Sequence, residues 1–448
     1  MSPGATARGS GAGRPASTAR GVALDVLERI DEGAYANLVL SGELGRSSLA
    51  QRDRALVTEL VYGTTRLRRA CDWMVDAHLH QPATDARVRA ALRLGAYQLA
   101  FTRIPAHAAV AATVGEAPLR ARGLVNAVLR RVSAGLPPVW PDLATELSYP
   151  DWIVDRLCAD LGKEAARSAL VQMNEAPVVT TRADGYVQDL GSQWVAELVG
   201  ARPGERVADL CAAPGGKATA IAAQASGAGQ ATTIGATGAV GHVEGGPAGE
   251  GAETGGADQG HERRLLVFAG DVRPARARAM REGVRRLGLD RATGASANAT
   301  SATSATSASG ATVATVVADG RRPPIAPGSV DRVLVDAPCS GLGVLRRRPD
   351  ARWRVQAPDV GRLAALQRDL LAGAAPLLRP GGTLAYCVCT LTRAETIAVD
   401  EWLSAEHPEL VALPAPGAPW VSWGRGALLL PQAAGTDGMF LLRLTRKG

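Results

Sequence analysis

Two cysteines of this 448-residue chain lie in short motifs that each follow an apolar, strand-like run. Cys339 lies in Asp336-Ala-Pro-Cys-Ser-Gly341 after residues 332–335, and Cys389 lies in Tyr386-Cys-Val-Cys-Thr-Leu391 after residues 383–387. A cysteine near a helix N-terminus has a lowered pKa, and its thiolate is a strong nucleophile. A carboxylate and a thiol at such strand ends are costly to bury unless they are paired or used. The two motifs therefore predict thiol chemistry, with packing of small hydrophobic cysteines as the alternative.

A glycine-rich turn forms a third candidate site. The chain runs Asp209-Leu-Cys-Ala-Ala-Pro-Gly-Gly-Lys217 after a strand-like segment and before a helical one. Glycine lets the backbone pass close to a ligand, and a helix N-terminus offers free N–H groups. The spacing excludes a GxxxxGK[ST] phosphate loop, and Lys217 is informative because the chain has only three lysines. The alternative is a simple tight turn. The candidate binding residues are Cys211, Ala212, Ala213, Pro214, Gly215, Gly216 and Lys217.

Two further acidic residues end strand-like runs. Asp271 follows 265–269, and Asp319 follows 313–317. An acidic residue at the carboxyl end of a strand in an open α/β sheet is placed to hold a ribose hydroxyl. Each alone is equally typical of a helix N-cap. Because the carboxyl ends of parallel strands share one edge, we expect both to lie on the edge that carries Asp336 and the cysteines.

The elements that position these residues alternate between strand and helix. Such alternation favours a parallel sheet covered by helices. Apolar runs at 427–430 and 439–444 flank Gly435-Thr-Asp-Gly438, which predicts a C-terminal antiparallel hairpin. Residues 19–133 instead repeat apolar positions at helical spacing. The strands are expected at 206–210, 265–269, 313–317, 332–335 and 383–387, and the helices at 218–224, 274–287, 359–378 and 393–404.

Composition narrows the class of protein. Hydrophobic residues make up 46% and charged residues 21%, so the chain is globular. The net charge of +7 permits a polyanionic partner. We find no signal peptide and no apolar stretch of about 18 residues, so no membrane contact is expected. The six cysteines are few, and no histidine lies at ligand spacing from them, which indicates a reducing cytoplasm and no metal site.

The domain plan follows from these patterns. Residues 1–18 are expected to be a disordered tail, and residues 19–135 a helical domain. Residues 136–185 read as a linker and helical segment, and residues 186–448 as an α/β domain. Two low-complexity segments, about 225–262 and 291–312, cannot bury enough apolar surface to offset their chain entropy, so we expect disordered insertions.

Taken together, the motifs resemble those of the Sun family of S-adenosylmethionine-dependent RNA cytosine-C5 methyltransferases, and the helical block resembles a NusB-like RNA-binding domain. The bacterial small-subunit ribosomal RNA type of this family carries such a domain. The resemblance implies an all-α NusB-like domain followed by a Rossmann-like methyltransferase domain. It rests on Asp209–Lys217, Asp336–Gly341, Arg346–Asp350 with Trp353, Tyr386–Leu391, Gly435–Gly438 with Phe440, Arg52–Gly63 and Leu124–Arg130.

The resemblance also implies roles for the candidate residues. Cys389 matches the family's nucleophile, which adds to C6 of cytosine, and Cys339 matches the cysteine that assists product release. Asp336 matches a residue between the cofactor and the cytosine edge. The S-adenosyl-L-methionine contacts implied are Cys211 to Lys217, Asp271, Asp319 and Asp336. The implied partner is RNA, with small-subunit ribosomal RNA as the substrate, and we expect a monomer.

The sequence departs from the family in three places, one of which is the pair of low-complexity insertions, unusual for the family. Val388 and Thr390 flank the nucleophile where the family has Thr and Ser, and an RRM-like module that normally precedes the cofactor domain is largely missing from 136–185. Two alternatives stay open: a methyltransferase for another RNA such as tRNA, and a non-catalytic RNA-binding ribosome-assembly protein. The NusB-like block disfavours the first, and the two cysteines disfavour the second. Arg346, Arg347 and Arg348 are candidates for phosphate contacts.

Overall fold

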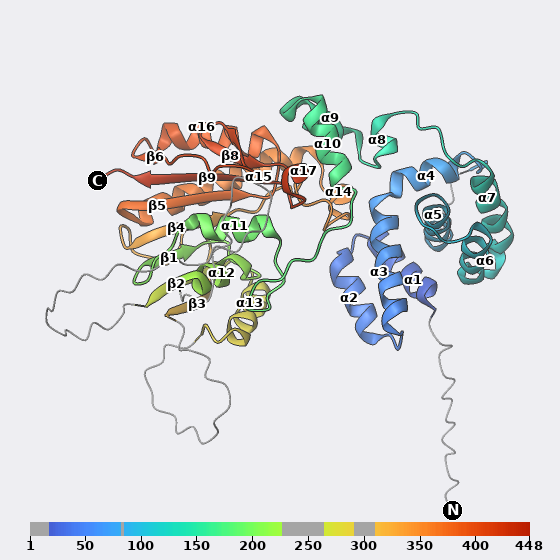
Figure 1. The fold of residues 1–448 in the computed structure, drawn as a ribbon, viewed down its shortest axis with the longest axis horizontal. Coiled ribbons are helices and arrows are strands. Elements are labelled where there is room, and N and C mark those ends of the chain that lie inside the picture. The colour runs from blue at the N-terminus through green and yellow to red at the C-terminus, as the bar shows by residue number, and fades with distance from the viewer. Residues whose placement is uncertain (1–17, 82–84, 226–263, 291–309) are drawn as a thin grey trace, which may run out of the picture. The chain divides into compact units, whose positions relative to one another are not determined.

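The computed structural model describes residues 18–81, 85–225, 264–290 and 310–448 (Figure 1). Nearly all of the predicted tail and of both predicted insertions lies outside these residues. The chain divides into two compact units. Unit 1 consists of Met1–Asp155 with Arg347–Arg354, and unit 2 of Arg156–Arg346 with Val355–Gly448. None of the helices in the described ranges combines the length and the apolar character needed to cross a bilayer.

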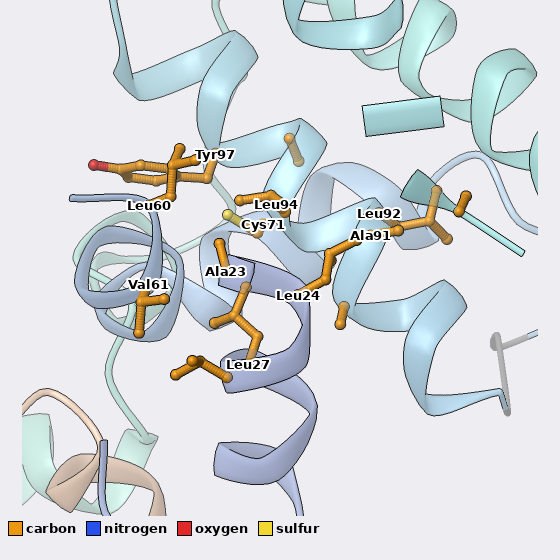
Figure 2. Close-up of a cluster of buried hydrophobic side chains, with 14 of the residues drawn as sticks. Ala23, Leu24, Leu27, Leu60, Val61, Cys71, Ala91, Leu92, Leu94 and Tyr97 are labelled. Atoms are coloured by element: carbon orange, nitrogen blue, oxygen red, sulfur yellow. The ribbon is translucent and has the colours of Figure 1, made fainter. Parts of the chain in front are cut away.

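Unit 1 is helical, as its apolar spacing predicts. Helix α1 begins where the Thr18 side chain accepts a hydrogen bond from Gly21 N at 2.9 Å. Its apolar face meets α3 and α5 in a core that includes Leu24, Leu60 and Cys71 (Figure 2). The helices are α1 (Ala19–Asp31), α2 (Ala36–Arg46), α3 (Gln51–Arg66), α4 (Arg68–Asp76), α5 (Ala86–Phe101), α6 (Ala106–Glu116), η1 (Leu119–Ala121), α7 (Arg122–Ala134), α8 (Leu143–Glu146) and α14 (Ala351–Arg354).

The domain bounds differ from the expected ones, because unit 1 extends to Asp155 and takes in Arg347–Arg354 from far along the chain. Arg352 is fully buried in this unit. Its guanidinium donates to the carbonyl oxygens of Arg66 at 3.0 Å and Ser148 at 3.1 Å, and to the Tyr149 hydroxyl at 3.2 Å. Trp353 donates its Nε1–H to Thr65 O at 2.7 Å. The segment also lines a cavity of about 130 Å³ in unit 1.

Unit 2 is built on a nine-stranded mixed sheet of order β3-β2-β1-β4-β5-β9-β8-β7, with β6 also paired to β9. Strands β1 to β5 run parallel to one another, and β9 runs antiparallel to β5. Every predicted strand is present. The strands are β1 (Arg206–Asp209), β2 (Leu265–Asp271), β3 (Ala311–Val317), β4 (Val330–Asp336), β5 (Leu378–Val388), β6 (Leu410–Ala412), β7 (Val421–Trp423), β8 (Gly426–Leu429) and β9 (Met439–Arg446).

Helices connect the strands of unit 2. Helices α12 and α13 pack on β2 and β3, and α15 packs on β4 and β5. Helix α9 spans the boundary between the units. The helices are α9 (Asp151–Leu161), α10 (Lys163–Gln172), α11 (Leu190–Val199), α12 (Gly216–Ala225), α13 (Pro274–Arg286), α15 (Ala357–Ala374), η2 (Ala375–Leu377), η3 (Arg393–Glu395), α16 (Ile397–Glu406) and α17 (Pro431–Ala434).

The C-terminal pair of strands is antiparallel, as predicted, but a tight turn does not join it. Strands β8 and β9 pair from Ala427 with Leu441 to Leu429 with Met439. Helix α17 lies between them and ends at Gly435, whose φ of 60° is left-handed. Farther back, residues 173–189, between α10 and α11, contain no helix or strand, and one isolated bridge joins Thr181 to Val187.

Candidate functional site

The carboxyl ends of four neighbouring parallel strands gather the candidate residues. In the order β2-β1-β4-β5, these strands end at Asp271, Asp209, Asp336 and Val388. Strand order reverses between β1 and β4, which is the point where open α/β sheets bind ligands. The glycine-rich turn follows β1, the Cys339 motif follows β4 and the Cys389 motif ends β5, so one edge carries three of the sequence motifs.

The structure brings the two cysteine side chains together. Cys339 Sγ and Cys389 Sγ lie 3.3 Å apart, which is thiol hydrogen-bond distance, and none of the six cysteines forms a disulfide. Backbone hydrogen bonds fix the approach: Ala337 N donates to Cys387 O and Gly343 N to Cys389 O, both at 3.0 Å. The hydrogen bond with Cys389, together with burial, raises the pKa of Cys339 well above its usual value. The pair can therefore hold one proton between two sulfurs.

Asp336 is the hub of a polar cluster beside the thiols. Its Oδ2 accepts from Lys217 Nζ at 2.6 Å, and its Oδ1 accepts from Cys387 Sγ at 3.3 Å. Burial alone would lower the pKa of Lys217, but the charge of Asp336 overcomes that effect and raises it. The lysine is thus a permanent cation that orients the carboxylate. Cys387 is fully buried and donates to this carboxylate.

The glycine-rich turn has the backbone conformation that its sequence predicts. Gly215 has a φ of +105°, a conformation that other residues rarely adopt, and its N–H donates to Ala212 O at 2.7 Å. Ala212 N donates to Gly270 O at 2.8 Å, which ties the turn to β2. Helix α12 begins at Gly216, so its first N–H groups face the sheet edge. Burial raises the pKa of the Cys211 thiol.

The two remaining acidic residues have different surroundings. Asp271 is 4% exposed, accepts from Arg273 N at 2.8 Å and forms an ion pair with Arg276 at 3.5 Å. Asp319 is half-buried and accepts from the Arg321 guanidinium at 2.7 Å, which lowers its pKa. It lines an open hollow with Arg321, and within the described ranges no hydrogen bond joins it to the other candidate residues.

Sequence reasoning missed several contributors. Asp209, quoted only as the start of the turn motif, is fully buried with no regular hydrogen-bond partner among the described residues. Burial, reinforced by the charge of Asp336, raises its pKa to about 8. Arg182 donates to Gly216 O at 2.7 Å, and its guanidinium carbon lies 4.8 Å from the centroid of the Tyr186 ring. It therefore stabilises the glycine-rich turn. The motif signalled Asp209, but no local pattern signalled Arg182.

One expectation about the arginines is wrong for Arg346. Arg346 is 2% exposed and donates to Gly435 O at 2.6 Å and Thr436 O at 3.3 Å. It therefore stabilises the Gly435–Gly438 segment and does not face solvent. Arg347 and Arg348 are exposed. Within the described residues no group of three or more His, Cys, Asp or Glu side chains could hold a metal ion.

A parallel sheet with a glycine-rich turn at its switch point, followed by a strand-end acid, is the architecture of a Rossmann-like cofactor enzyme. The family described as 16S rRNA methyltransferase RsmB/F matches residues 248–445, and the NusB family matches residues 17–134. The crystal structure of PH0851 shares the fold, with a TM-score of 0.67 at 19% identity over 95% of this chain and 98% of that one.

Relatives match nearly the whole chain. The ribosomal RNA small subunit methyltransferase B of Thermus thermophilus is 33% identical, with 96% of this chain and 98% of the relative covered. MT1451 of Mycobacterium tuberculosis, also named as a methyltransferase, is 34% identical, with 97% of each covered. The chain therefore belongs to the RsmB/F family of methyltransferases. This confirms the predicted family, the NusB-like block, the Rossmann-like domain and the use of S-adenosylmethionine.

Proposed function

We propose that this chain transfers a methyl group from S-adenosylmethionine to C5 of a cytosine in small-subunit ribosomal RNA, through a covalent bond between Cys389 Sγ and C6. The Cys389 thiolate adds to C6, and the ring electrons move to C5. The electron pair at C5 then forms a bond to the methyl carbon while the methyl–sulfonium bond breaks, and its electrons stay on sulfur as the donor departs as a neutral thioether. A base removes the proton from C5, the C5–C6 double bond re-forms, and Cys389 leaves as a thiolate.

The 3.3 Å separation of the two sulfurs carries this proposal. The hydrogen bond with Cys389, together with burial, raises the pKa of Cys339, so Cys339 stays a thiol beside the attacking sulfur. A neutral thiol next to the attacking sulfur can stabilise that sulfur as it leaves C6. Two thiols at this distance have no use in a protein that only binds RNA, so the arrangement favours catalysis over the non-catalytic alternative.

The methyl donor fits the strand-end residues. The bound donor supplies an electrophilic methyl group on a sulfonium. The α12 N-terminus and the turn at Gly215 offer N–H groups to a carboxylate, and Asp271 offers a buried acceptor for ribose hydroxyls. Asp336 contacts Lys217 through one carboxylate oxygen and Cys387 through the other, and we propose that it can reach both donor and cytosine from there. Cys211 to Gly216 and Asp319 complete the proposed contacts.

The RNA assignment rests on the relatives and on charge. The Thermus thermophilus relative is named for the small ribosomal subunit, and its match covers 96% of this chain, so it includes the NusB-like block at residues 17–134. Exposed Arg347 and Arg348 are the proposed phosphate contacts, within a chain of net charge +7. We also propose that the enzyme acts as a cytoplasmic monomer. Methylation of tRNA instead of ribosomal RNA is the competing outcome of the test.

The test uses the full chain, labelled methyl donor, and small-subunit ribosomal RNA and tRNA as separate substrates. Cys389→Ala should lose methyl transfer but keep donor affinity by calorimetry. Cys339→Ala should accumulate a protein–RNA adduct that survives a denaturing gel. Cys158→Ala, a half-buried cysteine in α9, is the control and should behave as wild type. Methyl transfer by Cys389→Ala at the wild-type rate would refute the covalent route, and label on tRNA alone would refute the substrate.

A further inference from the structure

Glu395 is a buried carboxylate that contacts both cysteine motifs. It ends the short helix η3 and is 0% exposed. Its Oε1 accepts from Ser340 N at 2.8 Å and from Gln367 Nε2 at 3.1 Å. Its Oε2 accepts from the hydroxyls of Ser340 at 2.5 Å, Thr392 at 3.0 Å and Thr390 at 3.1 Å. Five donors thus compensate the burial of one negative charge.

Two of these donors are sequence neighbours of the two cysteines. Ser340 directly follows Cys339, and Thr390 directly follows Cys389. The two hydroxyls also lie 2.8 Å from each other, so Glu395 closes a three-membered cluster between the motifs. Any displacement of this carboxylate moves the backbone beside both sulfurs.

Glu395 is itself held rigidly. Its backbone carbonyl accepts from the Tyr386 hydroxyl at 2.7 Å, and the same hydroxyl contacts Gln367 Oε1 at 3.0 Å. Tyr386 and Gln367 are fully buried. Because its backbone carbonyl and its carboxylate are both held by hydrogen bonds, Glu395 can keep the two cysteine motifs in a fixed arrangement. None of its hydrogen bonds within the described residues involves a sulfur atom.

We propose that Glu395 is a positioning residue that sets the distance and orientation of Cys339 and Cys389. This proposal rests on the proposed function, because it explains how the two thiols are held at the distance and orientation that the reaction uses. The negative charge of Glu395 also raises the pKa of Cys339, in addition to the hydrogen bond with Cys389 and burial.

The experiment compares Glu395→Ala and Glu395→Gln with Glu401→Gln, an exposed glutamate on α16. Misplacing a reacting group by about 1 Å can cost about 100-fold in rate. We therefore expect kcat to fall about 100-fold in Glu395→Ala, with KM for RNA and donor affinity within twofold of wild type. Glu395→Gln keeps the shape and some of the hydrogen bonds, so it should recover part of the rate. Glu401→Gln should match wild type.

A second readout does not depend on methyl transfer. Diamide accepts two hydrogens from a thiol pair and leaves a disulfide, and digestion with mass spectrometry identifies the Cys339–Cys389 link. Two sulfurs held 3.3 Å apart should couple at least about 10-fold faster in wild type than in Glu395→Ala, because loosening lowers their effective concentration.

The two readouts separate the proposals. Slower coupling in Glu395→Ala with an inactive wild-type enzyme would sink the proposed function but keep the positioning role. Wild-type kcat and wild-type coupling in both Glu395 variants would overturn the positioning role. Equal losses of kcat, donor affinity and thermal stability in both variants would also overturn it, because they would indicate a general folding role.

Discussion

Replacing Gly343 with alanine should loosen the backbone that holds the Cys389 carbonyl. A Cβ on Gly343 would overlap Gly438 O, and it would lie 2.8 Å from Gly438 C and 3.0 Å from Cys389 O. These are backbone atoms, which cannot rotate away. Gly343 also makes two backbone hydrogen bonds, from its N–H to Cys389 O at 3.0 Å and from Gly438 N to its carbonyl at 2.8 Å.

The expected loss follows from these contacts. Relieving the overlap requires the two backbones to separate, which breaks or stretches both hydrogen bonds at about 1 kcal/mol each. The overpacking that remains costs about 1–3 kcal/mol. The free energy of unfolding should therefore fall by about 3–5 kcal/mol. Because Gly343 holds the Cys389 carbonyl, methyl transfer should also fall, by about 100-fold for a displacement near 1 Å.

Urea titration of the full chain measures the first quantity, and labelled methyl transfer measures the second. Gly361→Ala is the matched control, since Gly361 is exposed on α15 and its added Cβ has no neighbour within 4 Å. That variant should be as stable as wild type or more stable by up to about 1 kcal/mol. A Gly343→Ala protein with wild-type stability and activity would refute the proposed close approach.

Two further predictions concern the acidic strand ends. The folded-state pKa of Asp209 is raised to about 8 from an ordinary value of 3.8, so the folded chain holds an extra proton between those values and loses stability as pH rises through them. Asp209→Asn should gain stability relative to wild type from pH 5 to pH 8, on the order of 1 kcal/mol per pH unit, and parallel stability curves would disprove this. For Lys217 and Asp336, a double-mutant cycle with Lys217→Met and Asp336→Asn should give a coupling energy of about 1–3 kcal/mol in unfolding titrations. Additive losses would show that the pair is not coupled.

Local patterns were sufficient for the elements and for most of the motif positions. Apolar runs with strand periodicity located β1 to β5, and helical spacing located the core of unit 1, because these signals depend only on neighbouring residues. The convergence of motifs on one edge also followed from parallel order, since carboxyl ends of parallel strands coincide. The predicted cysteines accordingly lie 3.3 Å apart.

Long-range partners were beyond such reasoning. Arg346 was expected to face phosphates, yet it is buried against the Gly435 carbonyl, 89 residues away. Glu395 falls in the first turn of the helix predicted at 393–404, where a glutamate is typically solvated, and its proposed role depends on Ser340, 55 residues away. The residues next to an arginine or a glutamate in the sequence are of the same kind whether its side chain is solvated or binds a group far along the chain. Composition and hydrophobic periodicity therefore could not distinguish a solvated side chain from a buried one.

The inclusion of Arg347–Arg354 in unit 1 limits how this protein can be rearranged by recombination. A crossover that exchanges residues 1–155 as one block would import new partners for Arg352 while keeping the old arginine. The retained Arg352 would then face other carbonyls than those of Arg66 and Ser148, to which it donates at 3.0 and 3.1 Å. We therefore expect hybrids with distant relatives to work best when the N-terminal block and this eight-residue stretch come from the same parent.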